Sequence, residues 1–513
     1  MFDAEELAKL PDKDLWAAFD GAENDTEKLE IYSVLKDRLW DKDEYNTIIG
    51  LSDRMCELAK ELDDLESAGR HRYTQGSANF NIKSFSDAAT AYGLASEIAA
   101  EIGDQVNLAQ ALWAKADSHL AMNDFENALS TSLESAKIAE SESRETLAGN
   151  AMFIHSKALY RLDREEEAIV ALEETRDFYR HAGNSNSVAE VDDYRVTVLE
   201  YLGRYAEANE YLRACLLVWE SRKNNEWIAY TNRRLGWNLT KVDEYIEAIP
   251  YFEAAKNKYF EIDRISEIPE CEYGIGSSYH HLGEHDKGIQ YLTQARALAD
   301  ANGNDFYAIR SDMMRAVSLH TLERFEEAKV LNFKLLHTLE NRKDNEYDDD
   351  AYLVRTRAAD NALKLESWAE IIEILAESPT NPAFVPQTQI LIWRMSIKAR
   401  ALLKLSREDE AFAEVDAALK LTTEAFENWV TAFLYEVRGL VLIHKNKREG
   451  ERDLAHAIAL HLANGQDEIA RTLSAHFMPS NENPFELDSS SLDDTSRENL
   501  GRSPAPSTAP RAN

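Results

Sequence analysis

Five short segments decide the fold of this chain: DFENA at 124–128, REEEA at 164–168, RYAEA at 204–208, EYIEA at 244–248 and EHDKG at 284–288. Each begins one residue before a recurring, mostly aromatic residue, which we call the ladder position, and the step between successive ladder positions is 40 residues every time. Three residues after each ladder position stands Ala, or Gly in the last segment. A fixed period of roughly 20–50 residues is typical of a solenoid built from stacked repeats.

The ladder continues in both directions along the chain. Projecting the 40-residue step upstream reaches two aromatic residues, and projecting it downstream reaches another, followed by one step of 43 residues and a return to 40, with a weak last match at Arg448. The pattern predicts about eleven helix pairs between residues 25 and 475. The ladder positions are Tyr45, Phe85, Phe125, Glu165, Tyr205, Tyr245, His285, Phe325, Trp368 and Glu408.

A second ladder lies nine residues upstream of the first and consists mostly of small residues. Gly is unfavourable in a helix interior by up to about 1 kcal/mol, so its recurrence predicts that two antiparallel helices pack very closely there. One hairpin of roughly 17- and 18-residue helices cannot bury its own apolar face, so successive hairpins must stack. The members of this small-residue ladder are Lys36, Gly76, Ala116, Ser156, Val196, Gly236, Gly276, Ala316, Ala359, Ala399 and Gly439.

The expected turns carry suitable residues. Acidic or capping side chains are favourable at helix starts, and Asp124, Asp243 and Glu244 stand where second helices should begin. Glycine can end a helix in a left-handed conformation. Glycines that lie 18 residues after a ladder position are Gly103, Gly183 and Gly303.

Composition narrows the class of protein. The net charge is −36, from 57 Lys and Arg against 93 Asp and Glu, which argues against nucleic-acid binding through phosphates. Three dispersed cysteines, Cys56, Cys215 and Cys271, offer no disulfide framework, and Cys215 is expected to be a small core residue. The N-terminus lacks the pattern of a signal peptide, and no segment has the roughly 20 apolar residues of a membrane span. We therefore expect a cytoplasmic protein with no membrane contact.

The pattern divides the chain into three parts. Residues 1–24 are expected to form N-terminal capping helices, residues 25–477 the solenoid, and residues 478–513 a disordered tail rich in Ser, Pro and Asp. The 43-residue step places a three-residue insertion near 341–352. The acidic cluster at 348–350 lacks the spacing of a calcium loop and is expected to be a solvated loop.

These ladders resemble those of the tetratricopeptide repeat (TPR) family, in which a small residue is followed by an aromatic residue and then by alanine at these spacings. The resemblance covers roughly residues 25–475. The period is 40 instead of about 34 residues, as in the long repeats of kinesin light chains, Pins-type adaptors and Rap-type bacterial peptide receptors. The Pro that commonly closes a repeat is absent from most units. The resemblance implies an all-α, right-handed α-solenoid of about eleven hairpins.

The resemblance also implies that the first helices line a concave groove that binds a peptide or helix of a partner protein. Arg side chains in such a groove can pair with carboxylates and stack on aromatic rings, although each of these residues also has the alternative of being an ordinary surface residue of a helix. Four acidic residues share the same face, so the groove should be mixed in charge: Asp117, Asp193, Glu270 and Asp360. The aromatic stripe Tyr73, Trp113, Phe153 and Tyr273 is expected to be inter-helix core. The implied groove residues are Asn150, Lys157, Tyr230, Arg233, Trp237, Ser277, Arg310 and Arg400.

The sequence contains none of the short motifs that mark a phosphate-binding loop, a nucleophile elbow or a zinc-binding helix. His281 and His285 are four apart but flank an expected turn at Gly283, and no third ligand accompanies them. We therefore expect a non-enzymatic scaffold or adaptor without metal or cofactor. A peptide-sensing regulator that resembles Rap-type receptors and a structural subunit of a larger complex are the alternatives, and the sequence leaves the oligomeric state open.

Overall fold

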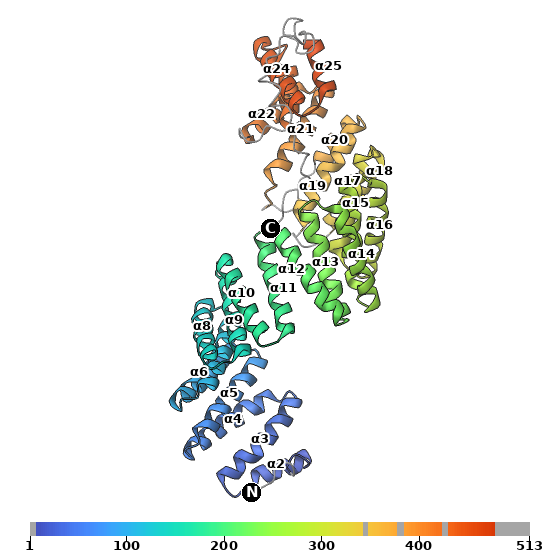
Figure 1. Ribbon diagram of the computed structural model, residues 1–513. Helices are drawn as coiled ribbons and strands as arrows, with labels where there is room; N and C mark the ends of the chain where they lie inside the picture. The colour runs from blue at the N-terminus through green and yellow to red at the C-terminus, as the bar shows by residue number, and fades with distance from the viewer. Residues whose placement is uncertain (1–6, 342–346, 377–383, 423–428, 478–513) are drawn as a thin grey trace. The chain divides into compact units, whose positions relative to one another are not determined.

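The computed structural model describes residues 7–341, 347–376, 384–422 and 429–477, and every regular element within them is helical (Figure 1). These residues form 24 α-helices, α2 to α25, and one short 3-10 turn, η1 (Ile265–Glu267). Successive helices pack against each other as antiparallel hairpins. The prediction of an all-α solenoid of helical hairpins is therefore confirmed.

Eleven hairpins lie between α2 (Asp12–Asp20) and the single last helix α25 (Asp467–Phe477). The first helices of the hairpins are α3 (Asp25–Asp41), α5 (Leu65–Asn81), α7 (Gln105–Ala121), α9 (Glu145–Arg161), α11 (Ser185–Tyr201), α13 (Asn225–Lys241), α15 (Ile268–His281), α17 (Asp305–Thr321), α19 (Asp348–Lys364), α21 (Thr388–Lys404) and α23 (Trp429–Leu442). The second helices are α4 (Tyr45–Glu61), α6 (Phe85–Glu101), α8 (Phe125–Ser141), α10 (Glu165–His181), α12 (Tyr205–Ser221), α14 (Tyr245–Glu261), α16 (His285–Ala301), α18 (Phe325–Glu340), α20 (Trp368–Ala376), α22 (Glu408–Leu421) and α24 (Lys447–Ala463).

Each ladder position from Tyr45 to Glu408 is the first residue of a second helix, and α24 begins at Lys447, one residue before the weak match at Arg448. Most helices have 17 residues, which corresponds to a length of about 25 Å. Turns of three residues join them in the regular part of the array, so each half of the 40-residue step has the same length.

A left-handed residue closes each of these turns. Gly183 has φ +69° and Gly283 has φ +79°, as expected for glycines that end helices, but Asn123 and Asp163 adopt the same conformation with φ 61° and 54°. The amide of the next residue donates to a carbonyl five residues back, as from Arg164 to Leu159 at 3.0 Å. The recurring turn therefore keeps one backbone geometry, which Gly, Asn and Asp tolerate at modest cost and which Lys, Ser or Glu adopts at other turns.

Side-chain capping occurs at the starts of first helices instead of the predicted second helices. Asp64 accepts from the Ser67 amide at 3.0 Å, and Asn184 accepts from the amide three residues after it at 3.2 Å. Asp124 makes no such bond, because its carboxylate accepts from the side chain of Asn127 at 2.8 Å. Asp243, with φ 62°, is the left-handed residue of its turn. Asp124 is thus the N-cap residue of α8, as predicted, but makes no side-chain capping bond; Glu244 directly precedes α14, and Asp243 lies one residue further out in the turn.

The small-residue ladder marks the closest approach of the two helices in a hairpin. A Cβ added to Gly76 would lie 2.7 Å from the ring of Tyr92, and one added to Gly236 would lie 2.8 Å from the ring of Phe252. Ala116 is fully buried at the equivalent place in its hairpin. Both rings lie seven residues after a ladder position, so one repeated contact sets the spacing of these hairpins. The predicted reason for the recurring small residues is thus correct.

The ladder aromatics are half-buried and pack across the hairpin turn. Phe85 meets Phe80 with ring centroids 5.1 Å apart, and Phe325 meets His320 at 5.2 Å. Phe125 instead lies under the guanidinium of Arg161 at 4.7 Å. Edge-to-face and cation–π contacts of this kind add a modest stabilisation to that of apolar burial. Because the ladder residues make them across the hairpin turn, they stabilise the turn more than the centre of the core.

The chain separates into two compact units, residues 1–258 and 259–513, with the division inside α14. The ladder gives no sign of this division, because the 40-residue step crosses it unchanged. In each unit the core lies between the helices of a hairpin and its neighbours, as in the cluster around Leu199 and Leu212 and the one around Val415 and Leu434. None of the described helices has the length and apolar character needed to cross a lipid bilayer.

The acidic cluster Asp348–Asp350 forms the first turn of α19. The prediction of a solvated loop for these residues is wrong, because the N-terminal end of a helix favours carboxylates and the cluster begins one. Residues 342–346 of the expected insertion and the expected tail at 478–513 lie outside the described residues.

Candidate partner-binding site

Within each unit, neighbouring first helices contact each other directly, as α7 does with α9 in the first unit, and α15 with α17 and α19 and α23 with α21 in the second. We call the side chains that stand 8, 11, 12 and 15 residues before a ladder position the first-helix face. All eight residues expected to line the groove belong to first helices. Five of them lie on α9 and α13 of the first unit, and three lie on α15, α17 and α21 of the second.

In the first unit, Lys157 is a half-buried cation among aromatic rings. Its Nζ lies 3.9 Å from the ring centroid of Phe153 and 5.8 Å from that of Tyr194. Burial lowers the pKa of Lys157, and Asp117 opposes this effect, while burial raises the pKa of Asp117 itself. Asn150 does not join this group, because its Oδ1 accepts from the hydroxyl of Tyr179 at 2.7 Å inside the hairpin.

An ionic network of the first unit surrounds Arg234, a residue that the sequence analysis did not identify. Its guanidinium donates to Asp193 Oδ1 at 2.7 Å and to Glu200 Oε2 at 2.6 Å, and Asn238 donates to Glu200 at 2.8 Å. The pKa of Asp193 is raised by burial, although Arg234 opposes the shift. These bonds join α13 to α11, so the network is a structural link between neighbouring hairpins.

The predicted residues around this network have packing contacts. Arg233 lies 5.5 Å above the ring of Tyr230, and Trp237 packs edge-to-face on Phe252 at 5.1 Å. In the second unit, Ser277 is buried with 9% exposure. The side chains of Trp237 and Ser277 therefore pack mainly inside their hairpins and contribute little to the predicted groove surface.

In the second unit, the first-helix face carries a row of charged side chains from successive helices. Arg310 Nη1 on α17 lies 3.8 Å from Asp350 Oδ1 on α19. Arg357, also on α19, is half-buried, and burial lowers the pKa of its guanidinium to about 10, with Asp350 and Asp360 opposing the shift and Arg310 adding to it. The pKa of Asp360 is raised by its own burial.

The row continues to Arg400 on α21. Its guanidinium lies 4.0 Å above the ring of Phe433 on α23, and burial lowers its pKa against the opposing effect of Glu436. Within the described part of the chain, the guanidinium group of neither Arg357 nor Arg400 makes a hydrogen bond or an ion pair. The sequence analysis indicated Arg400 but missed Arg357. The spacing in the sequence could have identified Arg357, because it stands 11 residues before its ladder position Trp368, just as Arg234 stands 11 residues before Tyr245.

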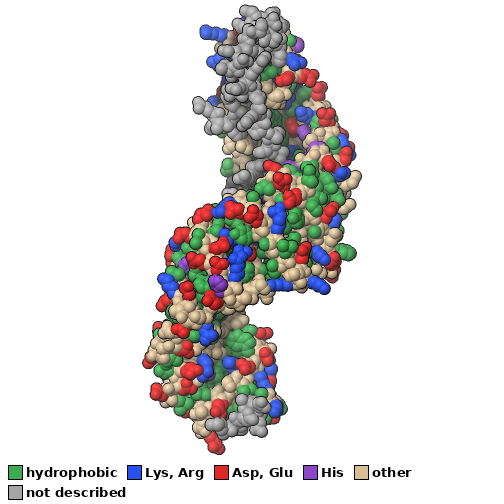
Figure 2. Space-filling model, in the orientation of Figure 1, with side chains coloured by type: hydrophobic (Ala, Val, Ile, Leu, Met, Phe, Trp, Pro, Cys, Tyr) green, Lys and Arg blue, Asp and Glu red, His purple; other side chains and the backbone are tan. Residues whose placement is uncertain are grey.

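Arginines at the outer turns behave differently. Four of them precede a ladder position by one residue, and each pairs with a Glu three residues later through two bonds, as Arg164 does with Glu167 at 2.8 and 2.7 Å. Figure 2 shows Lys and Arg interspersed with Asp and Glu over the visible surface. These four turn arginines thus each have an acidic partner, unlike the guanidinium groups of Arg357 and Arg400. The four pairs are Arg164–Glu167, Arg204–Glu207, Arg324–Glu327 and Arg407–Glu410.

His280 at the end of α15 is a buried neutral ring next to this row. Its Nδ1 lies 2.8 Å from Ser318 Oγ, and burial, aided by His281, His285 and Arg357, lowers its pKa to about 4. The contribution of the neutral ring to stability is therefore complete above the unfolded pKa of about 6.5 and is lost as the pH falls toward 4.

The wild-type protein should lose unfolding free energy between pH 7 and pH 4.5 as His280 becomes protonated. We expect His280→Gln to reduce this loss by up to about 3 kcal/mol. Urea denaturation at both pH values measures the difference. The exposed His337 on α18 gives the matched control, and an equal effect of His337→Gln would contradict the assignment.

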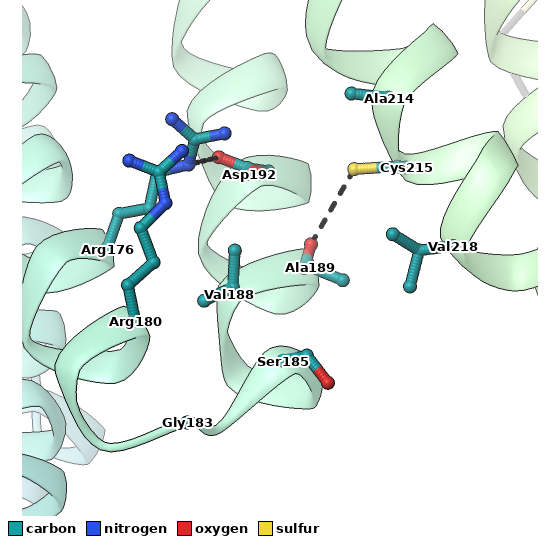
Figure 3. A pocket seen from close by; sticks show the side chains of 10 residues that line it. All are labelled: Arg176, Arg180, Gly183, Ser185, Val188, Ala189, Asp192, Ala214, Cys215 and Val218. Atoms are coloured by element: carbon teal, nitrogen blue, oxygen red, sulfur yellow. Dashed lines mark hydrogen bonds and ion pairs between the residues drawn. The ribbon is translucent and has the colours of Figure 1, made fainter.

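Two cavities open in the first unit, and neither involves the predicted groove residues. Figure 3 shows the smaller one, of about 310 Å³, between α10, α11 and α12. Arg176 Nε lies 2.8 Å from Asp192 Oδ1 in its wall. Cys215 donates to the Ala189 carbonyl at 3.9 Å, and burial raises the pKa of its thiol to about 12. The thiol is protonated at neutral pH, as expected for a core cysteine. The second cavity lies between α8, α9 and α10.

Among the described residues, no three His, Cys, Asp or Glu side chains come together in a way that could hold a metal ion. His285 Nδ1 lies 3.2 Å from His280 Nδ1, so His285 contacts His280 at the turn. The turn that was expected between His281 and His285 is present at Gly283.

No protein-family model and no curated protein matches the chain in sequence. Solved structures similar to it are TPR-like repeat proteins. They include the Cut9–Hcn1 hetero-tetramer of the APC/C (14% identity, 93% of this chain and 94% of that one, TM-score 0.37) and the apo quorum sensor NprR from B. thuringiensis (13%, 67% and 99%, 0.39). A third is a putative kinesin light chain of Podospora anserina with TPR-like repeats (14%, 39% and 97%, 0.34). The chain itself is an α-solenoid of TPR-like helical hairpins, as its ladders and helix contacts show.

Proposed function

We propose that this chain is a non-enzymatic protein-interaction scaffold that binds an acidic segment of a partner protein on the first-helix face of its second unit. One observation carries the proposal. Arg357 and Arg400 stand on successive first helices, and neither guanidinium group has a hydrogen-bonding or ion-pairing partner in the described part of the chain. Elsewhere on the face, Arg234 is held by two carboxylates, whereas Lys157 contacts only aromatic rings.

The energetics favour a carboxylate as the ligand. A partly buried guanidinium without a partner has lost hydration without gaining an ion pair, which is the cause of the lowered pKa of Arg357. Nearby Arg310 adds repulsion. A partner carboxylate would relieve both effects, and Arg can hold it through two parallel bonds.

Aromatic rings and a carboxyl group near the arginines would orient a bound ligand. The ring of Phe433 lies under the guanidinium of Arg400, and the ring of Phe306 lies 5.4 Å from that of neighbouring Arg310, so these two guanidinium groups have a ring contact before a ligand arrives. Asp360 stands on α19 three residues after Arg357, its Oδ2 lies 3.7 Å from His320 Nε2, and burial raises its pKa. A ligand whose carboxylates pair with the arginines and whose hydrogen-bond donor reaches Asp360 would bind in one fixed position along the row of first helices.

We expect Arg357→Ala combined with Arg400→Ala to weaken partner binding by about 10–100-fold, the effect of removing charge-assisted hydrogen bonds. Affinity capture from the source cells, at low and moderate salt, followed by mass spectrometry identifies the partner. Titration of the purified partner against both proteins then measures the change. Arg357→Lys, which keeps the charge and loses the planar fork, should have an intermediate effect.

Arg407→Ala is the matched control, because Arg407 is exposed and already paired with Glu410 at 2.6 Å. Melting curves for all variants separate lost binding from lost folding. Equal partner affinity of wild type and the double variant would overturn the proposed site. Catalytic turnover that a single substitution abolishes would contradict a non-enzymatic role. Co-purification of a small peptide would instead favour a peptide-sensing regulator.

A further inference from the structure

The larger cavity of the first unit is a groove between two second helices, on the side of the hairpins away from the first-helix face. It has a volume of about 650 Å³ and lies between α8 and α10, with α9 as its floor. We call it the second-helix groove. It shares no residue with the first-helix face of the second unit, so it provides a separate surface.

The floor and one wall of this groove are apolar. Met152 and Leu159 on α9 are buried with 5% and 3% exposure, and Leu129 and Leu133 on α8 are half-buried. Val170 on α10 has 61% of its surface exposed. Exposed apolar patches of this kind often mark sites where another molecule binds. The apolar floor and the exposed valine at its edge fit such a binding surface.

The rim of the groove is acidic. Glu126 on α8 and Glu174 on α10 are exposed along it, and Glu166, also exposed, is paired with Arg204 at 3.1 Å. The one arginine of the rim, Arg164, is bound through two bonds by Glu167 and adds no free positive charge. The groove therefore combines an apolar floor with negative edges.

The histidine of the groove adds no positive charge to this balance. His155 Nδ1 lies 3.1 Å from the carbonyl oxygen of Leu129, so this nitrogen carries a hydrogen and donates it. Burial lowers the pKa of His155, which keeps the ring neutral near pH 7. Acidic groups from α8 and α10 are thus the charges that a ligand meets at the edges.

We propose that the second-helix groove docks an amphipathic helix of a partner protein, with leucine-like side chains against Leu129, Leu133 and Val170 and with lysine or arginine beside Glu126 and Glu174. Residues 126–133 of α8 run for about 12 Å, which matches about two turns of a bound helix. Anchors at a spacing of three to four residues on one face are the usual means by which a helix occupies an apolar groove.

The chain contains a matched control for this groove. Val330 on α18 stands five residues after its ladder position, as Val170 does, and is 60% exposed. It lines neither of the two cavities described above. Glu140 on α8 is an exposed acidic residue outside the groove and serves as the control for charge.

The test uses the full chain and a fluorescent synthetic helix that carries leucines on one face and lysines on both flanks. A peptide of the same composition in scrambled order is the reference. We expect the ordered peptide to bind more tightly, and Val170→Glu to weaken it by about tenfold or more while Val330→Glu leaves it unchanged. Glu126→Lys with Glu174→Lys should also weaken binding and reduce its salt dependence, unlike Glu140→Lys.

A second measurement locates the peptide directly. Val170→Cys labelled with a photo-crosslinker should capture the ordered peptide, and Val330→Cys labelled in the same way should not. Equal binding of the ordered and scrambled peptides, or equal effects of Val170→Glu and Val330→Glu, would overturn the proposal. Self-association that Val170→Glu abolishes in sedimentation experiments would assign the groove to a second copy of this chain and would also overturn it.

Discussion

Replacing Gly276 by tryptophan is expected to unfold the hairpin of α15 and α16, at a cost of about 1–3 kcal/mol or more. A Cβ at this position would lie 2.7 Å from Leu292 Cγ, 3.0 Å from the Leu292 amide nitrogen and 3.1 Å from the Gly288 carbonyl oxygen. Two of these atoms belong to the backbone of the facing helix, which cannot move aside as a flexible side chain can. Even Gly276→Ala should therefore destabilise.

Gly50 provides the contrast, because it lies within α4 and a Cβ there would meet no atom within 4 Å. Gly50→Ala is expected to raise the free energy of unfolding by about 0.5–1 kcal/mol, the usual gain of alanine over glycine in a helix. Urea denaturation followed by circular dichroism measures both changes, and hydrogen exchange shows whether the loss is confined to α15 and α16. Unchanged melting of Gly276→Trp would mean that the close helix contact does not exist.

The second large effect is expected at Arg234, which is 9% exposed and joins two carboxylates on the neighbouring first helix. Arg234→Met should cost about 3–5 kcal/mol, because Asp193 and Glu200 would be left in a poorly hydrated place without a counter-charge. Arg204 is the matched control, since it also contacts two glutamates but on the surface, and Arg204→Met should change the stability little.

The penalty for losing Arg234 should shrink as the pH is lowered. Burial already raises the pKa of Asp193 above its ordinary value, and removal of Arg234 takes away the charge that opposes this shift. A carboxyl whose folded pKa exceeds its unfolded pKa favours the folded state more as the pH falls through that interval. Urea denaturation of wild type and Arg234→Met over a range of acidic pH measures the gap. A gap that widens on acidification would exclude Asp193 as its source.

The candidate site was only partly predictable. The periodicity placed Lys157, Arg310 and Arg400 on first helices, because their distance from the ladder position fixes the helix and the face on which they stand. It could not tell that Asn150 would bond within its hairpin or that Ser277 would be buried, since these outcomes depend on rotamers and neighbouring volume. Arg357 and Arg234 stand 11 residues before the ladder residue, a position outside the 8, 12 and 15 that the predicted groove residues occupy.

The amino-acid sequence by itself determined the helical hairpins, their starts at the ladder positions and the close contact at Gly76 and Gly276. These features follow from contacts within a single repeat, which recur with the period and are therefore visible in the order of residues. Only the tertiary structure decided which cations find a carboxylate, where the grooves between second helices open and where the chain separates into two units. Those outcomes depend on side chains from different hairpins, about 40 residues apart, whose mutual distances no local pattern encodes.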